Sequence, residues 1–432
     1  FGLQIRKFGH SLAIISGKYD DPDDPGDVSH FQALCAALSG TIGVGNIAGV
    51  ATAIHAGGPG ALFWMWVAAF FGMMTKYSEC LLSLKYRVVH EDGTVSGGPM
   101  YYIEKGLGPK FKWLAVTFAF CAIIGTFGGG NMVQSNSMAL AVEDNFIQKY
   151  NNETSISDLN NGNGITLVKG AEFRITPKNG SSFDVELADV NVIGGFLQAI
   201  NFHPQNAEHF VVASISQDQN RIDIVDTSVG DSEFNISEIN NSKVLHELGF
   251  IHSTGKINKI KDAIISTIVP KMLLLRIIVG VVTSAIVGVI IIGGMKRLGN
   301  VAGKLVPAMA GIYVGGGLLI LILNINAIPD AFYLVFKHAF TPTSAAGGFA
   351  GASVLYTITW GIKRAAFSNE AGMGSAPIAH ATAKTKEPVR EGLVALAEPF
   401  IDTIIICTIT ALVIIVTGAW KTNADSSVLT KN

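Results

Sequence analysis

The sequence predicts an all-α protein that crosses a membrane several times and carries a small inserted α+β domain. Composition is the first observation: of 432 residues, 49% are hydrophobic and only 15% are charged, and the mean hydropathy is +0.40. The second is a set of apolar stretches long enough to cross a hydrocarbon core about 30 Å thick. The third is a single long polar segment between them. A net charge of −2, without a dense basic block, argues against a nucleic-acid partner.

Windows of about twenty apolar residues predict seven membrane-spanning helices, at 31–56, 61–84, 112–141, 272–293, 299–324, 345–366 and 392–419. If these spans alternate, most Lys and Arg residues of the short loops lie on one side of the membrane, and that side is cytoplasmic. The segment between the third and fourth spans is then expected outside the cytoplasm. Lys259, Lys261, Lys271 and Arg276 lie against this orientation, but they follow a long loop, where the rule is weak.

The inserted domain is predicted at about 142–265, where the composition becomes polar. Alternating residues at 173–175 and 183–187 flank Pro-Lys-Asn-Gly-Ser-Ser and predict a β-hairpin, and 210–215 with 221–225 predict another. Residues 192–201 suit a short amphipathic helix. We therefore expect three parts: 1–141 and 266–432 form the membrane bundle, and 142–265 form an extracytoplasmic α+β domain without cysteine.

The first span contains a glycine-rich interruption at 39–50, which reads Ser-Gly-Thr-Ile-Gly-Val-Gly-Asn-Ile-Ala-Gly-Val. Non-helical backbone at membrane depth is tolerated only where it is buried in protein or lines a cavity. Close helix packing would also explain the glycines. Thr41 and Asn46 beside the break, and a second interrupted span at 347–352, favour a binding site between two half-transporters. Half-helix N–H groups would bind a carboxylate, and freed carbonyls would bind Na⁺.

Polar residues inside the other spans are the next candidates, because they are costly in a membrane. Gln134 lies in an amide-rich run at 131–137 and could bind a substrate or join helices. Asp402 and Glu79 are candidates for cation or proton coupling, although Glu79 more simply pairs with Lys76. His55 and His380 are interpreted as interfacial. Residues 367–376 could form a cytoplasmic gate or a re-entrant turn. The sequence contains no hydrolase, metalloprotease or phosphate-loop motif, so an enzyme is not expected.

Four motifs resemble the alanine or glycine:cation symporter family, also called sodium:alanine symporters. They are Gly-Gly-Pro-Gly-Ala-Leu-Phe-Trp-Met-Trp-Val at 57–67, Ser-Gly-Gly-Pro-Met-Tyr-Tyr-Ile-Glu-Lys-Gly at 96–106, Gly-Asn-Met-Val-Gln-Ser-Asn at 130–136, and the stretch from Phe367 through 381–384. The resemblance implies a leucine-transporter-like inverted-repeat helix bundle and Na⁺-coupled uptake of alanine or glycine across the bacterial cytoplasmic (inner) membrane.

The resemblance also implies site residues. The substrate would contact Thr41, Gly43, Gly45, Gln134, Gly348, Phe349 and Gly351. The cation would contact Asn46 and main-chain carbonyls around Ser39 and Ile42. No cofactor other than Na⁺ as coupling ion is expected.

The sequence departs from the family in two ways. Family members have one additional helix before Phe1 and several helices after Trp420, so the bundle is expected to be incomplete at both ends. The insert occupies a short loop of the family, and 158–165 with 183–201 are similar to the flagellin hook IN motif, which implies an extracytoplasmic scaffold with a protein partner. A membrane-anchored receptor or adhesion protein is therefore the alternative to a transporter.

Overall fold

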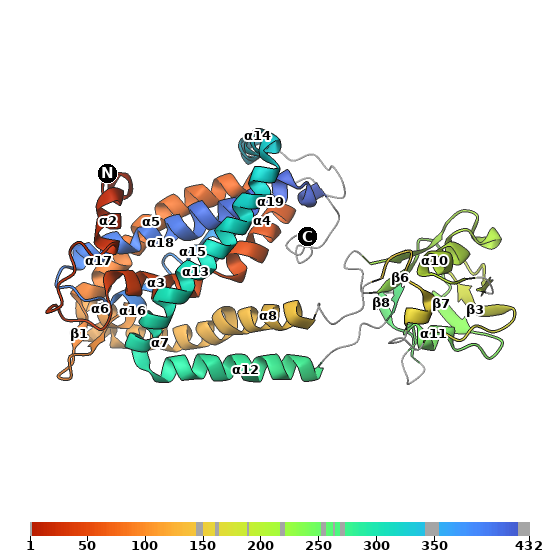
Figure 1. The fold of residues 1–432 in the computed structure, drawn as a ribbon, viewed down its shortest axis with the longest axis horizontal. Coiled ribbons are helices and arrows are strands. Elements are labelled where there is room, and N and C mark those ends of the chain that lie inside the picture. The colour runs from red at the N-terminus through yellow and green to blue at the C-terminus, as the bar shows by residue number, and fades with distance from the viewer. Residues whose placement is uncertain are drawn as a thin grey trace. The chain divides into compact units, whose positions relative to one another are not determined.

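The computed structural model describes residues 2–143, 150–159, 164–187, 190–216, 221–251, 256–261, 264–267, 273–341 and 354–421. The chain divides into two compact units, which are described separately. The helical unit contains Phe1–Ala139 and Ile278–Asn432, and the insert unit contains Leu140–Ile277. Figure 1 shows the helices and strands with the labels used below.

The helical unit consists almost entirely of helices. Its first part contains α1 (Leu3–Arg6), α2 (Phe8–Ile15), α3 (His30–Thr41), the π-helix η1 (Gly45–Gly49), α4 (Val50–Gly57), α5 (Ala61–Lys85), the short strands β1 (Val88–Val89) and β2 (Val95–Ser96), α6 (Pro99–Leu107), η2 (Pro109–Phe111), α7 (Lys112–Gly125), the π-helix η3 (Thr126–Met132) and α8 (Val133–Glu143). Its second part contains α12 (Leu273–Ile292), α13 (Gly294–Leu323), η6 (Ile325–Ala327), α14 (Ile328–Phe340), α15 (Val354–Asn369), α16 (Ser375–His380), α17 (Pro388–Ala395), α18 (Ala397–Pro399), the π-helix η7 (Phe400–Cys407), α19 (Thr408–Val416) and η8 (Ala419–Lys421).

Four helices in the described part of the chain are long and apolar enough to cross a membrane, and a bent helix pair would be a fifth span. The four are Pro109–Val142, Leu274–Ile292, Gly294–Leu323 and Pro388–Val416, and the pair is His30–Thr41 with Gly45–Gly57. These match five of the seven predicted spans. The predicted span 61–84 is α5, which has 25 residues but is less apolar because it contains Lys76, Glu79 and Lys85. The predicted span 345–366 begins outside the described residues and continues as α15.

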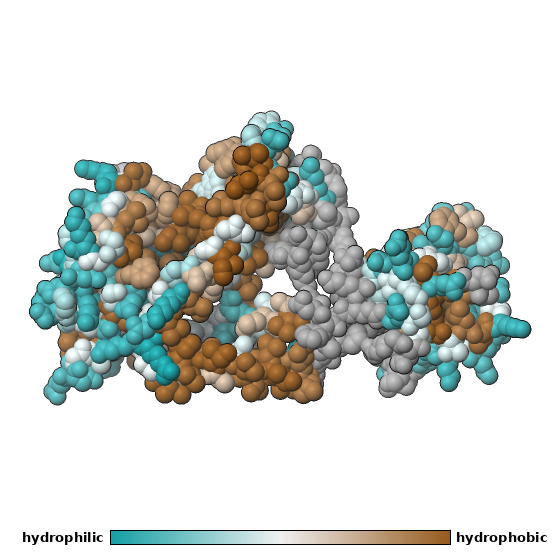
Figure 2. Space-filling model, viewed as in Figure 1, coloured by the Kyte–Doolittle hydropathy of each residue, from teal (hydrophilic) through white to brown (hydrophobic). Residues whose placement is uncertain are grey.

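Apolar side chains cover much of the long helices, and polar ones gather at the end of the unit that holds α2, α6 and α17 (Figures 1 and 2). We call this the charged end. Leu274 and Ile312 are 71% and 79% exposed on α12 and α13, which suits helix faces in contact with lipid. In the interior, Ile54, Leu62, Met65 and Val335 join α4, α5 and α14 in one apolar core.

Two local features explain how these helices begin and pack. Ser29 and Gln32 form a capping box at the start of α3, in which each side chain accepts the other residue's backbone N–H. Gly60, just before α5, lies so close to α14 that a Cβ atom there would come within 2.2 Å of the His338 backbone. Only glycine permits this approach of the two helices.

The insert unit contains two antiparallel sheets. Its elements are η4 (Ile156–Asp158), β3 (Ala171–Thr176), β4 (Phe183–Glu186), α10 (Ile193–Asn201), η5 (Pro204–Asn206), β5 (Val211–Ile215), β6 (Ile222–Asp226), β7 (Asn235–Glu238), α11 (Val244–Glu247), β8 (Lys259–Lys261) and β9 (Ile264–Ser266). The strand orders are β4-β3-β7 and β5-β6-β9-β8. Both predicted hairpins, β3–β4 and β5–β6, and the predicted helix α10 are confirmed.

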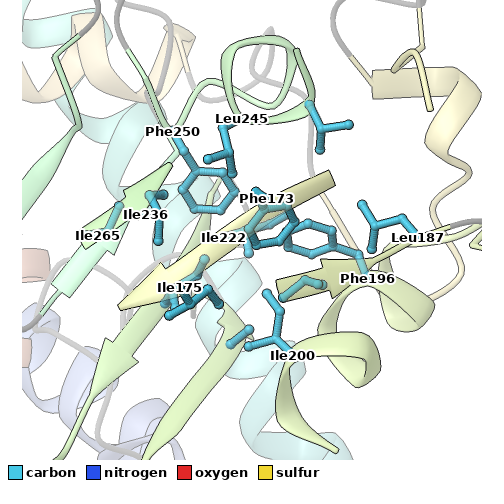
Figure 3. Packing of buried hydrophobic residues seen from close by; sticks show 14 of the residues in the cluster. Phe173, Ile175, Leu187, Phe196, Ile200, Ile222, Ile236, Leu245, Phe250 and Ile265 are labelled. Carbon is cyan, nitrogen blue, oxygen red and sulfur yellow. The ribbon is translucent and has the colours of Figure 1, made fainter. Parts of the chain in front are cut away.

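Aromatic and branched side chains form the core of the insert unit (Figure 3). Phe196 on α10 packs against Phe173 of β3 and Phe250, with ring centroids 5.9 and 6.2 Å apart. The alternation that predicted the strands is visible in their burial, since Phe173 and Ile175 are buried while Arg174 is exposed. One face of each strand therefore supplies the core.

Candidate functional site

The predicted break in the first span is present. Helix α3 ends at Thr41, Ile42 is extended (φ −74°, ψ 108°), and the helix resumes at η1 with a bend of 57°. The hydroxyl groups of Ser39 and Thr41 donate back to the carbonyls of Ala36 (2.6 Å) and Leu38 (3.4 Å). Both hydroxyl oxygens keep lone pairs free to accept from a ligand or to bind a cation.

Gln134 lies directly against this break. Its Oε1 accepts the Val44 N–H at 3.2 Å, and Asn46 Oδ1 accepts the Gly43 N–H at 2.7 Å. A Cβ on Gly43 would lie 2.9 Å from Gln134 Nε2, so a larger residue would displace this amide. Two side-chain amide oxygens thus accept hydrogen bonds from backbone N–H groups at the start of a half-helix, where a carboxylate would also be stabilised.

Asp402 forms a second polar centre, which is joined to the break by Asn46. The Asn46 amide donates to Asp402 Oδ1 at 2.6 Å, and the hydroxyls of Ser368 and Thr403 each donate to Asp402 Oδ2 at 2.8 Å. All four residues are buried. Among the residues that the structure describes, no Lys, Arg or His forms an ion pair with Asp402. A buried carboxylate without a cationic partner is costly unless it is protonated or binds a cation.

A second helix break follows α15, within the stretch 367–376 that the sequence left as a gate or a re-entrant turn. Three residues between α15 and α16 have positive φ: Glu370 (52°), Gly372 (85°) and Gly374 (85°). Asn369, the last residue of α15, donates to Thr403 Oγ1 at 3.1 Å. The break predicted at 347–352, with Gly348, Phe349 and Gly351, lies outside the described residues.

The first break contacts the end of α15, just before the second break. A Cβ on Gly45 would lie 3.6 Å from the Phe367 ring and from the Ser368 backbone. The Asn46 amide also donates to Ser368 Oγ at 3.0 Å. Of the predicted site residues, the structure therefore brings together Gly43, Gly45, Asn46 and Gln134, with Thr41 and Ile42 on the preceding turn and Ser39 one turn earlier.

Two interpretations of charged residues were wrong. Lys76 pairs with Glu398 on α18, at 2.9 Å, whereas Glu79 accepts the Gly372 N–H at 3.4 Å. His380 is fully buried beside Glu391 and is not interfacial. Sequence reasoning also missed Ser368 and Thr403, since hydroxyl residues are common in spans. The adjacent pair Asp402-Thr403 inside an apolar run was the available signal.

Comparison with known proteins identifies the family of the chain. Residues 2–170 and 241–432 match the model of the sodium:alanine symporter family. The sodium/alanine symporter AgcS of Methanococcus maripaludis is 36% identical over 418 residues, which cover 96% of this chain and 64% of the relative. An uncharacterized transporter of Haemophilus influenzae is 35% identical over 97% of this chain and 64% of its own length. A Bacillus subtilis protein named "Probable sodium/glutamine symporter GlnT" is 28% identical over 93% of this chain and 56% of its own length.

The chain thus spans less than two thirds of the length of these relatives. The unmatched residues 171–240 hold β3 to β7 of the insert unit. The matched residues hold both helix breaks, Gln134 and Asp402. The chain is a multi-pass membrane protein that belongs to the sodium:alanine symporter family.

Proposed function

We propose that this protein is a secondary transporter that carries small neutral amino acids, alanine or glycine, into the cytoplasm together with Na⁺. The observation that carries the proposal is the helix break at Ile42 to Val44, which contacts Gln134 on one side and the buried Asp402 centre, through Asn46, on the other. Membership of the sodium:alanine symporter family supports the class of substrate and the coupling ion.

The substrate would lie at the break between α3 and η1. Its carboxylate would replace the amide oxygen of Gln134 at the Val44 N–H, and Gln134 would then turn to bind the substrate. A Cβ on Gly43 would lie 2.9 Å from Gln134 Nε2, so little room remains beside the break, and this favours a small side chain. Thr41 would line the same side of the substrate site. Gly348, Phe349 and Gly351 are proposed for the opposite wall on the family resemblance alone.

The cation would lie near Asn46 and Asp402. Na⁺ is a hard cation that prefers oxygen ligands, and this centre offers a carboxylate with the hydroxyls of Ser368 and Thr403. Main-chain carbonyls around Ser39 and Ile42 are proposed as further ligands. A bound Na⁺ would neutralise the buried carboxylate, so cation binding and the stability of the break would be linked.

The architecture and orientation follow from the same proposal. The two breaks, one after α3 and one after α15, suit a leucine-transporter-like inverted-repeat bundle. The positive-inside rule favours a bacterial inner-membrane location with the charged end in the cytoplasm and the 142–265 domain on the outer side. The insert domain would then be available to an extracytoplasmic protein partner.

Uptake of labelled alanine by proteoliposomes that contain the protein tests the proposal. We expect accumulation when an inward Na⁺ gradient is imposed, and little accumulation when K⁺ replaces Na⁺. Excess unlabelled glycine and glutamine, added separately, would define the accepted side chain. Equal uptake in K⁺ would contradict Na⁺ coupling. Alanine binding without any uptake would favour the alternative of a membrane-anchored receptor.

A further inference from the structure

A second group of buried ionisable residues lies apart from the proposed transport site, toward the charged end. Its centre is Glu391 on α17, whose two carboxylate oxygens contact two different imidazoles. Glu391 Oε1 lies 2.5 Å from His380 Nδ1, and Glu391 Oε2 contacts His30 Nδ1. All three side chains are fully buried. This group was not predicted from the sequence, because His30 lies 361 positions before Glu391 in the chain.

The group continues in both directions from Glu391. His380 Nε2 lies 3.8 Å from Glu398 Oε2, and Glu398 Oε1 pairs with Lys76 Nζ at 2.9 Å. On the other side, His30 Nε2 lies 3.9 Å from Asp20 Oδ1, and the Asp20 side chain is 37% exposed. The Nε2 atoms of both histidines and Glu398 Oε2 have no hydrogen-bond partner. A row of acid and base groups thus leads from Lys76 in the interior to Asp20 at the surface.

The histidines of this row each lie between two carboxylates. His380 lies between Glu391 and Glu398, and His30 lies between Glu391 and Asp20. A buried carboxylate is strongly unfavourable unless a cation or hydrogen-bond donors accompany it. An imidazolium donates from both ring nitrogens, so an additional proton on one histidine would give both of its acidic neighbours a cationic partner. The described residues contain no cluster of His, Cys, Asp and Glu arranged to bind a metal ion, so a proton is the cation that fits.

The position of the two histidines gives this proton a mechanical role. His30 is the first residue of α3, the half-helix before the first break, and His380 is the last residue of α16, the half-helix after the second break. Glu391 joins these two half-helices at their tips. A movement that opens a path between α3 and α16, leading to the two breaks, must therefore separate His30 or His380 from Glu391.

We propose that the His30–Glu391–His380 bridge is a proton-binding site, and that one bound proton holds α3 and α16 closed at the charged end. Closure places an imidazolium against a carboxylate away from water, whereas opening returns both to water with their ordinary proton affinities. The closed state therefore binds the proton more tightly. By linkage, closure is favoured at low pH and is lost as the pH rises through the range in which the closed bridge releases its proton.

Other ionisable groups face the bridge from neighbouring elements. They are Lys76, Glu79 and Cys80 on α5, Arg87 after α5, Asp20 before α3 and Glu398 on α18. Asp402 on η7 faces Glu398. Arg87 acts on Glu391 at longer range, and its guanidinium donates to the carbonyls of Ala381, Ala383, Pro25 and Thr385. Arg87 thus stays charged on both sides of the transition and does not contribute to the response to pH.

The protonation state can be measured directly by nitrogen NMR of imidazole-labelled histidine in the full chain in lipid nanodiscs. Spectra of His30→Gln and His380→Gln variants assign the two signals. We expect one charged imidazole in the bridge at pH 8, where a free imidazole, with a pKa of about 6.5, is neutral. Two neutral or two charged imidazoles at pH 8 would overturn the proposal.

The mechanical role is tested by amide hydrogen exchange of α3 and α16, corrected for the intrinsic effect of pH. Wild-type protection should fall at least tenfold between pH 6 and pH 9. The Glu391→Gln variant should already show this low level of protection at pH 6. The matched control is Glu104→Gln, which removes an exposed pair with Lys112 on the neighbouring α6 and α7.

Equal, pH-independent protection in wild type and Glu391→Gln would contradict the mechanical role. If Glu391→Gln fails to fold, the pH dependence of the wild type still decides the question. Neither experiment uses substrate or Na⁺, so their failure is separate from failure of the proposed transport function.

Discussion

The two units of the protein treat buried carboxylates differently. In the insert unit, Glu172 accepts the Val168 N–H at 2.6 Å and Asp226 accepts the Ser228 N–H at 2.9 Å, so each fixes a local backbone turn. In the helical unit, Asp402, Glu391 and Glu398 accept from side chains of other helices. The first arrangement stabilises one conformation. The second connects different helices, which is the arrangement expected of the proposed transporter.

The apolar cores show the same contrast. The insert unit has one continuous core of aromatic and branched residues, and its ion pairs lie at the surface. The helical unit has several separate apolar clusters, with polar centres between them. We infer that substitutions in the insert unit change its stability, whereas substitutions of buried polar groups in the helical unit change ligand binding. The following experiments test that division, beginning with the largest expected effect.

Phe196→Ala should destabilise the insert unit most, because Phe196 is 2% exposed and contacts Phe173 and Phe250. Loss of a buried phenylalanine costs about 3–5 kcal/mol, a large part of a typical domain stability of about 5–15 kcal/mol. Hydrogen exchange of β3 and β5 should accelerate by more than about a hundredfold, since about 1.4 kcal/mol corresponds to a factor of ten.

Phe202→Ala is the control for this experiment, since Phe202 is 72% exposed at the end of the same helix. It should leave the exchange of β3 and β5 nearly unchanged. Alanine uptake should be the same in both variants if the units are independent in function. A loss of uptake in Phe196→Ala alone would contradict the inference that the two units are independent in function.

Asp402→Asn should raise the Na⁺ concentration needed for half-maximal alanine uptake. The substitution keeps the shape of the side chain and removes the charge, so it loses a charge-assisted interaction worth about 1.5–3 kcal/mol, or about 10- to 150-fold in affinity. Asp330→Asn, an exposed change in the first turn of α14, is the control. Unchanged Na⁺ dependence in Asp402→Asn would remove Asp402 from the cation site.

The elements that local patterns determine were predicted well from the sequence. The alternation at 173–175 and 183–187 gave the β3–β4 hairpin, because one face of each strand is buried and the turn residues are local. The break in the first span was predicted from the glycines at 43 and 45, which are also a local signal. The break after α15 was not identified as a helix break. One of its positive φ values belongs to Glu370, and only tertiary contacts make that conformation acceptable for a residue other than glycine.

The site residues that depend on long-range contacts were predicted less completely. Gln134 stood out because an amide-rich run is rare in a span. The predicted partner of Lys76 was wrong. The i, i+3 spacing to Glu79 suggested a pair within α5, whereas the observed partner, Glu398, approaches from another helix. The bridge of His30, Glu391 and His380 joins residues more than 300 positions apart. No local pattern reports such contacts.

Gln134→Ala should weaken alanine binding modestly. It removes the hydrogen bond that Gln134 is proposed to form with the substrate, worth about 1 kcal/mol, so we expect a reduction of about fivefold in affinity. Asn136→Ala, an exposed change two residues along the same helix, is the control. Isothermal titration of alanine in the presence of Na⁺ would measure both. Equal affinity in wild type and Gln134→Ala would show that Gln134 only joins helices.

The smallest effect concerns pH and the insert unit. Arg174 donates two hydrogen bonds to Asp184, at 2.6 and 2.8 Å, across the β3–β4 pair, and these lower the pKa of Asp184. A lowered pKa in the folded state stabilises the fold above the unfolded pKa of about 3.9, and this contribution is lost as the pH falls through the folded value. Both side chains are more than a third exposed, so the pair contributes less than about 1 kcal/mol.

Asp184→Asn should therefore lower the free energy of unfolding of the insert unit slightly at pH 7, and the difference from the wild type should shrink as the pH falls below the unfolded pKa. Urea unfolding of the full chain, followed through isoleucine methyl NMR signals of β3 and β6, would measure this. Asp231→Asn is an exposed control that should follow the wild-type pH profile. If Asp184→Asn lowered Na⁺-dependent uptake at pH 7 without changing unfolding, a surface carboxylate of the insert would affect transport, and the contrast between the two units would fail.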